Sequence, residues 1–337
     1  MGLIYMTSEL PHRTVRTALV EARGALPVLR ESALAQPGAG QVLVAMKAAA
    51  LNFADLLMVS GSYQDTPPYP FVPGMEGAGE VIAAGPGCTL REGARVAVGA
   101  MGCLTEAGLF DESACQPIPD AMSFDQAAGF QIAYGSSHLA LDLRARLRAG
   151  ETLAVLGAAG GVGLTAVEIG AAMGARVIAV ARGADKLDVA RKAGAAELID
   201  SDETGDLRAA LRQAGPVDVV YDPVGGAAGL AAFGALRPGG RFLVVGFAGG
   251  APPDLPLNHA LVKNIAIHGF YWAGYHRLDP AALRASMETL LAMFEEGKLR
   301  PHIGAAMPLS DLQTAYEALR ARKIAGKLIV RTAPEAP

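Results

Sequence analysis

Residues 153–163 read Leu153-Ala154-Val155-Leu156-Gly157-Ala158-Ala159-Gly160-Gly161-Val162-Gly163, an apolar run that ends in a glycine-rich loop. A helical stretch follows, and a second apolar run occupies 176–180. A tight turn from strand to helix needs small residues so that the backbone can approach a pyrophosphate, which the free N–H groups of the helix N-terminus then bind. Ala158 replaces the first glycine of the usual G-x-G-x-x-G pattern, but the elements come in the required order. The pattern predicts a dinucleotide-binding loop made by Ala158, Ala159, Gly160, Gly161, Val162 and Gly163; the alternative is a plain βαβ unit with a glycine-tolerant turn.

The end of the second apolar run bears on which dinucleotide this loop would hold. A site for NAD has Asp or Glu there, about twenty residues beyond the loop, to accept from the ribose hydroxyls. This chain has Ala181-Arg182-Gly183-Ala184 instead, and Lys186 follows one helical turn after Arg182. Both cations could pair with a 2′-phosphate, so the sequence favours NADPH. The alternative is a solvated basic pair at the start of a surface helix.

Short apolar runs alternate with helical stretches around the loop, at 152–156, 176–180, 217–221, 241–246 and 265–270. Continuous apolar strands separated by helices predict a parallel sheet covered on both faces. Residues 14 to about 128 are instead rich in Val, Gly and Pro, with short alternating runs such as 41–47 and 93–98, which predicts a β-rich region. The 337 residues suit two domains at the usual size of about 150 residues each.

The composition excludes several classes of protein. Hydrophobic residues make up 51% of the chain and charged residues 18%, so a largely disordered chain is excluded. The net charge is −4 and there is no basic run, so we expect no nucleic acid partner. No uncharged run reaches the roughly 18 residues that span a bilayer, and no signal peptide is evident, so we expect no membrane association and a cytoplasmic location. The three cysteines are widely spaced, so we expect buried thiols rather than disulfides or a zinc knuckle.

Four motifs in order carry a resemblance to a known family. They are Leu51-Asn52-Phe53-Ala54-Asp55, Gly61-Ser62-Tyr63, Pro73-Gly74-Met75-Glu76-Gly77-Ala78-Gly79 and the loop at 158–163. With them the chain resembles the medium-chain dehydrogenase/reductase superfamily over nearly its whole length, and within it the zinc-independent NADPH:quinone oxidoreductase family. The resemblance implies an α/β protein with a GroES-like β-rich catalytic domain at 1–128 and 278–337, a Rossmann doubly wound parallel sheet domain at 129–277, and cofactor and substrate in a cleft.

Two positions bear on zinc. Zinc alcohol dehydrogenases have Cys where this chain has Asn52, and His where it has Met75. An amide and a thioether do not replace a thiolate and an imidazole on zinc. We therefore expect no metal, and hydride transfer from NADPH to an electrophile that conjugation already activates, such as a quinone or an α,β-unsaturated carbonyl.

The resemblance also implies catalytic residues. Tyr63 occupies the position at which related enoyl-thioester reductases carry a tyrosine thought to stabilise or protonate the enolate, and a neutral phenol can donate to a developing oxyanion. The alternative is a packed tyrosine in a Pro-rich turn. Asn52 would hydrogen-bond near the nicotinamide ribose or the substrate, and its alternative is a turn residue before a helix.

Further residues are expected to line the cofactor. Ser136 stands where the family often has a threonine facing the nicotinamide, and Lys327 matches a family lysine near the cofactor phosphates. The aromatic residues after two predicted strands could wall the nicotinamide pocket or be core and dimer contacts. One departure weakens the NADPH assignment, because Asp200-Ser201 stands where the family often has Asn-Tyr. The strand-end residues expected in this pocket are Gly246, Phe247, Phe270 and Trp272.

The sequence thus predicts an NADPH-dependent, zinc-independent reductase of quinones or activated alkenes. Two alternatives stay open: an enoyl-thioester reductase acting on acyl-CoA, and an NADPH-binding protein with little catalysis. The apolar run 265–270 should lie at the edge of the sheet, where an exposed strand invites pairing with a second copy, so we expect a homodimer.

Overall fold

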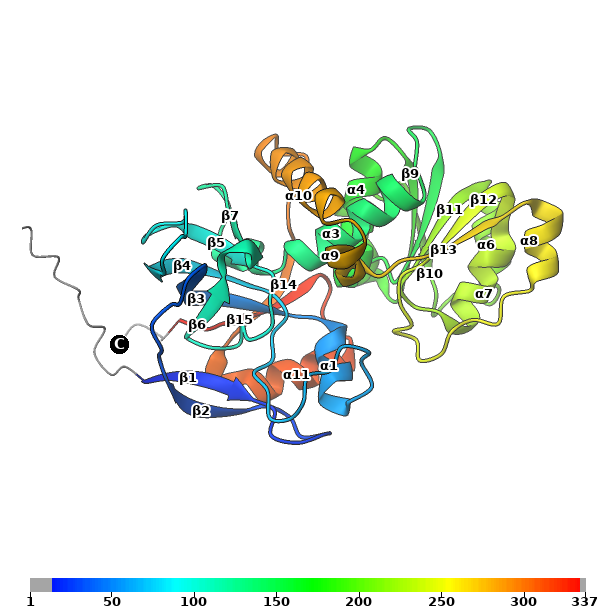
Figure 1. Ribbon diagram of the computed structural model, residues 1–337. Coiled ribbons are helices and arrows are strands. Elements are labelled where there is room, and N and C mark those ends of the chain that lie inside the picture. Colours follow the sequence, from blue (N-terminus) through cyan, green and yellow to red (C-terminus); the bar gives the residue numbers. More distant parts are fainter. Residues whose placement is uncertain (1–13, 334–337) are drawn as a thin grey trace, which may run out of the picture. The chain divides into compact units, whose positions relative to one another are not determined.

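The computed structural model describes residues 14–333, which form two compact units (Figure 1). The first unit contains the described residues up to 128, 306–321 and those from 329 on; the second contains 129–305 and 322–328. The proposed domains differ from these units mainly in the segment 278–305, which belongs to the second unit. The reason is that helix α10 (Pro280–Glu295) packs on α3 (Gln131–Leu139), with the rings of Phe294 and Phe130 edge to face at 6.4 Å.

The second unit is built on a six-stranded parallel sheet in the order β10-β9-β8-β11-β12-β13. The chain runs outward from β8 in one direction, returns, and runs outward from β11 in the other, which is the Rossmann strand order with its switch point between β8 and β11. The predicted Rossmann fold is therefore confirmed. Its strands are β8 (Thr152–Leu156), β9 (Arg176–Ala181), β10 (Glu197–Asp200), β11 (Val217–Asp222), β12 (Leu236–Val244) and β13 (Ala266–Gly269).

Helices connect these strands and cover the sheet. Every residue of β8 and of β11 is buried, which is why β8 is a continuous apolar run and β11 is apolar except for Asp218 and Asp222. Among these helices, α3 packs against α4, and α6 packs against α7. The helices are α4 (Gly161–Ala172), α5 (Ala184–Lys192), α6 (Leu207–Gln213), α7 (Gly226–Ala235), α8 (Leu257–Lys263) and the short α9 (Tyr275–Leu278), with a π-turn at Ala140–Arg144 after α3 and a 3₁₀ turn at Trp272–Gly274.

The first unit is the predicted β-rich region. Its main sheet has the order β14-β15-β3-β4-β5-β7, with β6 also paired to β3, and β1 and β2 form a separate antiparallel pair. The helices are α1 (Phe53–Ser60), α2 (Phe124–Ala128) and α11 (Leu312–Ala321). The strands are β1 (Thr14–Leu19), β2 (Val28–Ala33), β3 (Gln41–Leu51), β4 (Gly77–Ala84), β5 (Arg95–Val98), β6 (Ala107–Asp111), β7 (Cys115–Pro117), β14 (Ile303–Pro308) and β15 (Lys327–Arg331).

Two expectations from composition can be compared with this fold. Cys88, Cys103 and Cys115 are free and buried, which confirms the expectation for the thiols. Between residues 14 and 333, none of the helices combines the length and the apolar character that crossing a bilayer requires.

Candidate functional site

The glycine loop joins β8 to α4 and folds tightly against the first turn of that helix. Gly157 turns the chain with φ +58°, and the N–H of Gly160 donates to its carbonyl at 2.8 Å. A Cβ on Gly163 would lie 2.8 Å from the carbonyl carbon of Gly157 and closer still to its oxygen. Real Cβ atoms do not approach that closely, so only glycine fits at position 163.

The start of α4 offers uncapped donors. Gly160 is the N-cap, no side chain caps the helix in the described chain, and its first turn holds no acidic residue. The first helical hydrogen bond runs from the N–H of Leu164 to the carbonyl of Gly160, so the N–H groups of the three residues between them precede the helical ladder. This arrangement fits the anionic pyrophosphate that the sequence predicts.

Lys327 lies beside this loop although it comes from the other end of the chain. The N–H of Gly326 donates to the carbonyl of Ala159 at 2.8 Å and ties the start of β15 to the loop. The stem of Lys327 passes Gly161, whose Cβ would be 3.4 Å from its Cδ, and Gly129, whose Cβ would be 3.1 Å from its Cε. Lys327 is 6% exposed, so its stem is packed and its ammonium is held in this neighbourhood.

Three cations gather beyond the end of β9. Arg182 is exposed there, and the Lys186 ammonium donates to the carbonyl of Arg322 at 2.5 Å. Partial burial and the charge of Arg182 lower the pKa of Lys186, while Asp202 opposes the shift. Arg322, whose guanidinium donates to the carbonyl of Ala248, was not among the residues predicted to bind the 2′-phosphate. No local signal could have identified it, because only the return of the chain brings residue 322 to this place.

Asp200 introduces a negative charge into the same neighbourhood. Its carboxylate accepts the N–H of Gly183 at 3.1 Å and the N–H of Asp202 at 3.0 Å. These bonds fix the turn that leads into α5 and set the carboxylate one residue from Arg182. The departure noted in the sequence is therefore a structural part of this turn, and it moderates the positive potential there.

The remaining predicted residues of the second unit lie on α3 and at strand ends. Ser136 is 6% exposed, and its neighbour Ser137 joins α3 to α4 by accepting from or donating to Thr165 Oγ1 at 2.7 Å and donating to the carbonyl of Val162 at 2.9 Å. The indole of Trp272 lies on α3, where a Cβ on Gly135 would be 2.5 Å from Nε1. Beyond the carboxyl ends of β12 and β13 lie Gly246, Phe247 and Phe270, the last two 39% and 8% exposed.

In the first unit, Asn52 is held by two buried carboxylates. It is the N-cap of α1, and its backbone N–H donates to Asp55 at 2.8 Å. Its side-chain Nδ2 donates to Glu76 at 3.0 Å, and a carboxylate acceptor settles which end of the amide faces it. Asp55 and Glu76 are each 1% exposed. Asp55 belongs to the motif at 51–55 and Glu76 to the motif at 73–79, but the sequence alone did not identify these carboxylates as the partners of Asn52.

Tyr63 follows α1 in the same unit. The helix ends at Gly61 in the left-handed region, φ +66°, and the half-buried Tyr63 comes two residues later. Both the N–H and the hydroxyl of Thr66 donate to the carbonyl of Tyr63, at 3.2 and 2.7 Å. The turn therefore fixes the backbone of Tyr63 through its carbonyl group.

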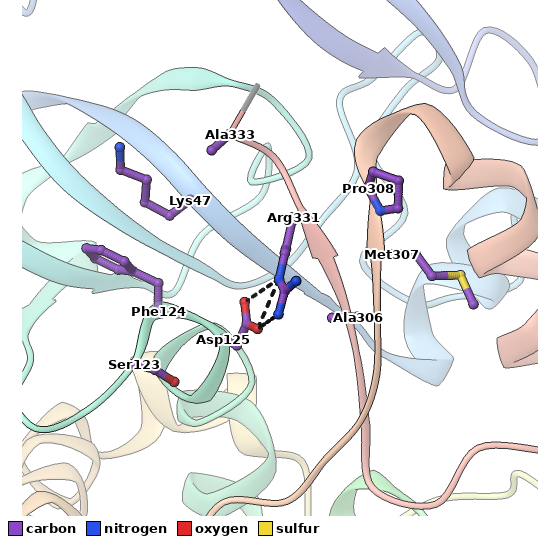
Figure 2. A pocket seen from close by; sticks show the side chains of 9 residues that line it. All are labelled: Lys47, Ser123, Phe124, Asp125, Ala306, Met307, Pro308, Arg331 and Ala333. Carbon is purple, nitrogen blue, oxygen red and sulfur yellow. Dashed lines mark hydrogen bonds and ion pairs between the residues drawn. The ribbon is translucent and has the colours of Figure 1, made fainter. Parts of the chain in front are cut away.

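A cavity of about 490 Å³ lies elsewhere in the first unit (Figure 2). The guanidinium of Arg331 faces the carboxylate of Asp125 there and donates to it at 2.7 Å (Figure 2). No residue predicted for the cofactor or for catalysis lines this cavity. Its lining consists of Lys47, Ser123, Phe124, Asp125, Ala306, Met307, Pro308, Arg331 and Ala333.

Two family profiles match the chain: "Alcohol dehydrogenase GroES-like domain" over residues 38–135 and "Zinc-binding dehydrogenase" over residues 161–293. Despite the second description, no group of three His, Cys, Asp or Glu side chains that could hold a metal is found in residues 14–333.

Individual proteins match over almost the full length. A quinone oxidoreductase-like protein 2 homolog from Nematostella vectensis is 36% identical over 302 residues, which are 88% of this chain and 82% of the relative. The quinone oxidoreductase of Thermus thermophilus, solved also as its complex with NADPH, superposes with a TM-score of 0.82 at 32% identity over 94% of this chain and 99% of that one. The Escherichia coli quinone oxidoreductase complexed with NADPH superposes with a TM-score of 0.85 at 27% identity, over 95% of this chain and 100% of that one.

Proposed function

Because this chain belongs to the medium-chain dehydrogenase/reductase superfamily and to its quinone oxidoreductase family, we propose that it is an oxidoreductase that uses NADPH and transfers a hydride to a quinone or an α,β-unsaturated carbonyl without zinc. The observation that carries the proposal is the loop at 158–163, whose backbone leaves no room for a Cβ at Gly163 and presents uncapped N–H groups.

The residues present fit the cofactor. The N–H groups at the start of α4 would bind the pyrophosphate, with Lys327 as a nearby cation. Arg182, Lys186 and Arg322 would bind the 2′-phosphate. Ser136, Gly246, Phe247, Phe270 and Trp272 would line the nicotinamide, since ligands bind at the carboxyl ends of the strands in doubly wound sheets. When bound, the nicotinamide supplies the hydride.

The donor set around Asn52 supports chemistry without zinc. Its amide nitrogen donates to Glu76, so the side chain could offer a metal only a neutral amide oxygen in place of the thiolate that zinc alcohol dehydrogenases carry there. Met75 offers only a thioether. The substrate must then be activated by its own conjugation. Tyr63 would donate a hydrogen bond to the carbonyl oxygen on which negative charge develops, and Asn52, fixed by Glu76, would orient cofactor or substrate.

The cation cluster predicts the preference for NADPH. Replacing Arg182 or Lys186 by Ala should raise the KM for NADPH about tenfold and leave the KM for NADH unchanged, since each loses one charged contact to the phosphate that NADH lacks. Arg191→Ala, which changes an exposed arginine on helix α5 with Lys186, is the matched control and should change neither value. Equal effects of Arg182→Ala on the two cofactors would show that the cluster does not bind the 2′-phosphate.

The edge of the Rossmann sheet supports the proposed homodimer. The outer side of β13 carries no further strand among the described residues, and Ile267 is 38% exposed. The preceding helix α8 exposes Leu257, Leu261 and Val262 by 69–78%. Light scattering at micromolar concentration should give about twice the chain mass of 34.6 kDa, and Ile267→Lys should lower it to that of one chain, because a charge on an edge strand opposes pairing. A wild-type monomer would reject the dimer.

The function itself is tested by assaying the purified protein with NADPH and with NADH against a naphthoquinone, an alkenal and crotonyl-CoA. The proposal expects turnover of the quinone or the alkenal with NADPH, unchanged after dialysis against a chelator. Turnover of crotonyl-CoA alone would replace it by an enoyl-thioester reductase. Binding of NADPH without any turnover would leave a nucleotide-binding protein.

A further inference from the structure

Two neutral side-chain groups on or beside α3 are among the buried N–H donors of the second unit that have no acceptor. They are Nε1 of Trp272 and Nε2 of Gln131, both inaccessible to solvent and without a hydrogen-bond partner. A buried donor left unpaired loses its hydrogen bonds to water without replacement, so such groups in a folded protein require an explanation. The simplest explanation is that a bound ligand supplies the hydrogen-bond acceptor.

Gln131 lies on α3, and the Trp272 side chain packs against the same helix. The Trp272 indole lies directly on Gly135, and Gln131 precedes Gly135 by four residues, one helical turn earlier on the same side. Gln131 is 8% exposed, so its amide is packed into this region. Ser136, expected to face the nicotinamide, is the residue after Gly135. If Ser136 lines the nicotinamide as proposed, the two donors lie along the helix that borders the reactive end of the cofactor.

The neighbouring polar groups already have partners. The Tyr134 hydroxyl donates to Glu168 at 2.5 Å, and Ser137 is bonded to Val162 and Thr165. The ring contact of Trp272 with His276 is edge to face at 5.3 Å between centroids and requires no indole N–H. A phenylalanine could make the same packing contacts, so packing does not explain why the side chain at this position carries an N–H.

We propose that Trp272 Nε1 and Gln131 Nε2 donate hydrogen bonds to carbonyl oxygen of the bound ligand. This inference rests on the proposed function and adds two polar contacts to it. The carbonyl belongs either to the nicotinamide carboxamide or to the electrophilic substrate. In the second case the two neutral donors would polarise the substrate carbonyl, which is the task that zinc performs in a metal-dependent relative.

The test uses the fact that the chain contains one tryptophan. A ¹⁵N-labelled sample gives a single indole N–H signal, whose proton moves downfield when it forms a hydrogen bond. Adenosine 2′,5′-bisphosphate, which lacks both carbonyl groups, should leave the signal in place. A downfield shift with NADP⁺ alone identifies the carboxamide, and a shift only after addition of 2-cyclohexen-1-one to the NADP⁺ complex identifies the substrate. NADP⁺ cannot reduce the enone, so the ternary complex does not react.

Calorimetry on the same samples separates the two ways of failing. If NADP⁺ and the enone bind but the indole signal does not move downfield, the inference is overturned and the proposed function stands. If no ligand binds, both fall.

Variants give a second readout. Trp272→Phe keeps the ring and removes the N–H, and Gln131→Met keeps the length and removes the amide. Each should weaken the ligand that moved the signal about tenfold and leave adenosine 2′,5′-bisphosphate unchanged. His276→Ala removes the ring neighbour of Trp272 and should change neither affinity. Wild-type affinity in both Trp272→Phe and Gln131→Met would contradict the proposal.

Discussion

Gly163→Ala should weaken NADPH binding at least about a hundredfold, because the added methyl group meets main-chain atoms that cannot rotate away. The new Cβ would be 2.8 Å from the carbonyl carbon of Gly157 and 3.1 Å from the Cα of Ala158, so either the loop or the first turn of α4 must shift. A shift at this point misplaces the N–H groups that would bind the pyrophosphate. Isothermal titration with NADPH measures the loss.

The same loop supplies the control. A Cβ on Gly161 would meet only the Cδ of Lys327 at 3.4 Å, which is an ordinary van der Waals contact. Gly161→Ala should therefore bind NADPH within about twofold of the wild type. Circular dichroism of both variants checks that they fold. A folded Gly163→Ala that binds NADPH like the wild type would contradict the assignment of the loop.

Tyr63→Phe should lower kcat for an enone by roughly 10²–10³-fold, the usual range for losing a positioned proton donor. Hydride addition to an enone leaves an enolate that needs a donor at its oxygen, and the phenol is our candidate. A quinone yields a hydroquinone anion that is more stable by itself, so its turnover should fall much less. The affinity for NADPH should not change, since the hydroxyl is assigned to the substrate.

Tyr69→Phe is the matched control in the same turn region. The Tyr69 hydroxyl donates to the carbonyl of Met58 at 2.8 Å, so its removal should lower the free energy of unfolding by about 1 kcal/mol and leave kcat unchanged. Steady-state assays with an enone and a quinone, run on both variants, measure the contrast. Full enone turnover by Tyr63→Phe would remove Tyr63 from the mechanism.

The Rossmann unit was largely predictable from sequence. The central strands β8 and β11 are buried along their whole length, so their mainly apolar sequences give their positions directly. The loop between β8 and α4 depends on glycines that the sequence displays. The segment 278–305 was harder to assign, because the packing of α10 on α3 is a tertiary contact with no local signal.

The candidate site was only partly predictable for the same reason. Arg322 reaches Lys186 through the return of the chain, and Asp55 and Glu76 act on Asn52 through hydrogen bonds that a motif does not reveal. The unpaired N–H of Trp272 could not be foreseen either, because a sequence shows an indole but not whether its N–H has an acceptor.

The central claim is that this chain delivers a hydride from NADPH to a conjugated electrophile without a metal. The most direct measurement follows deuterium from NADPH deuterated at C4, prepared as each of the two stereoisomers, into the product of chelator-treated protein by mass spectrometry. We expect one isomer to give a deuterated alkanal from an alkenal, at the rate of the untreated protein. Unlabelled product from both isomers, or turnover that returns only after zinc is added, would contradict the account.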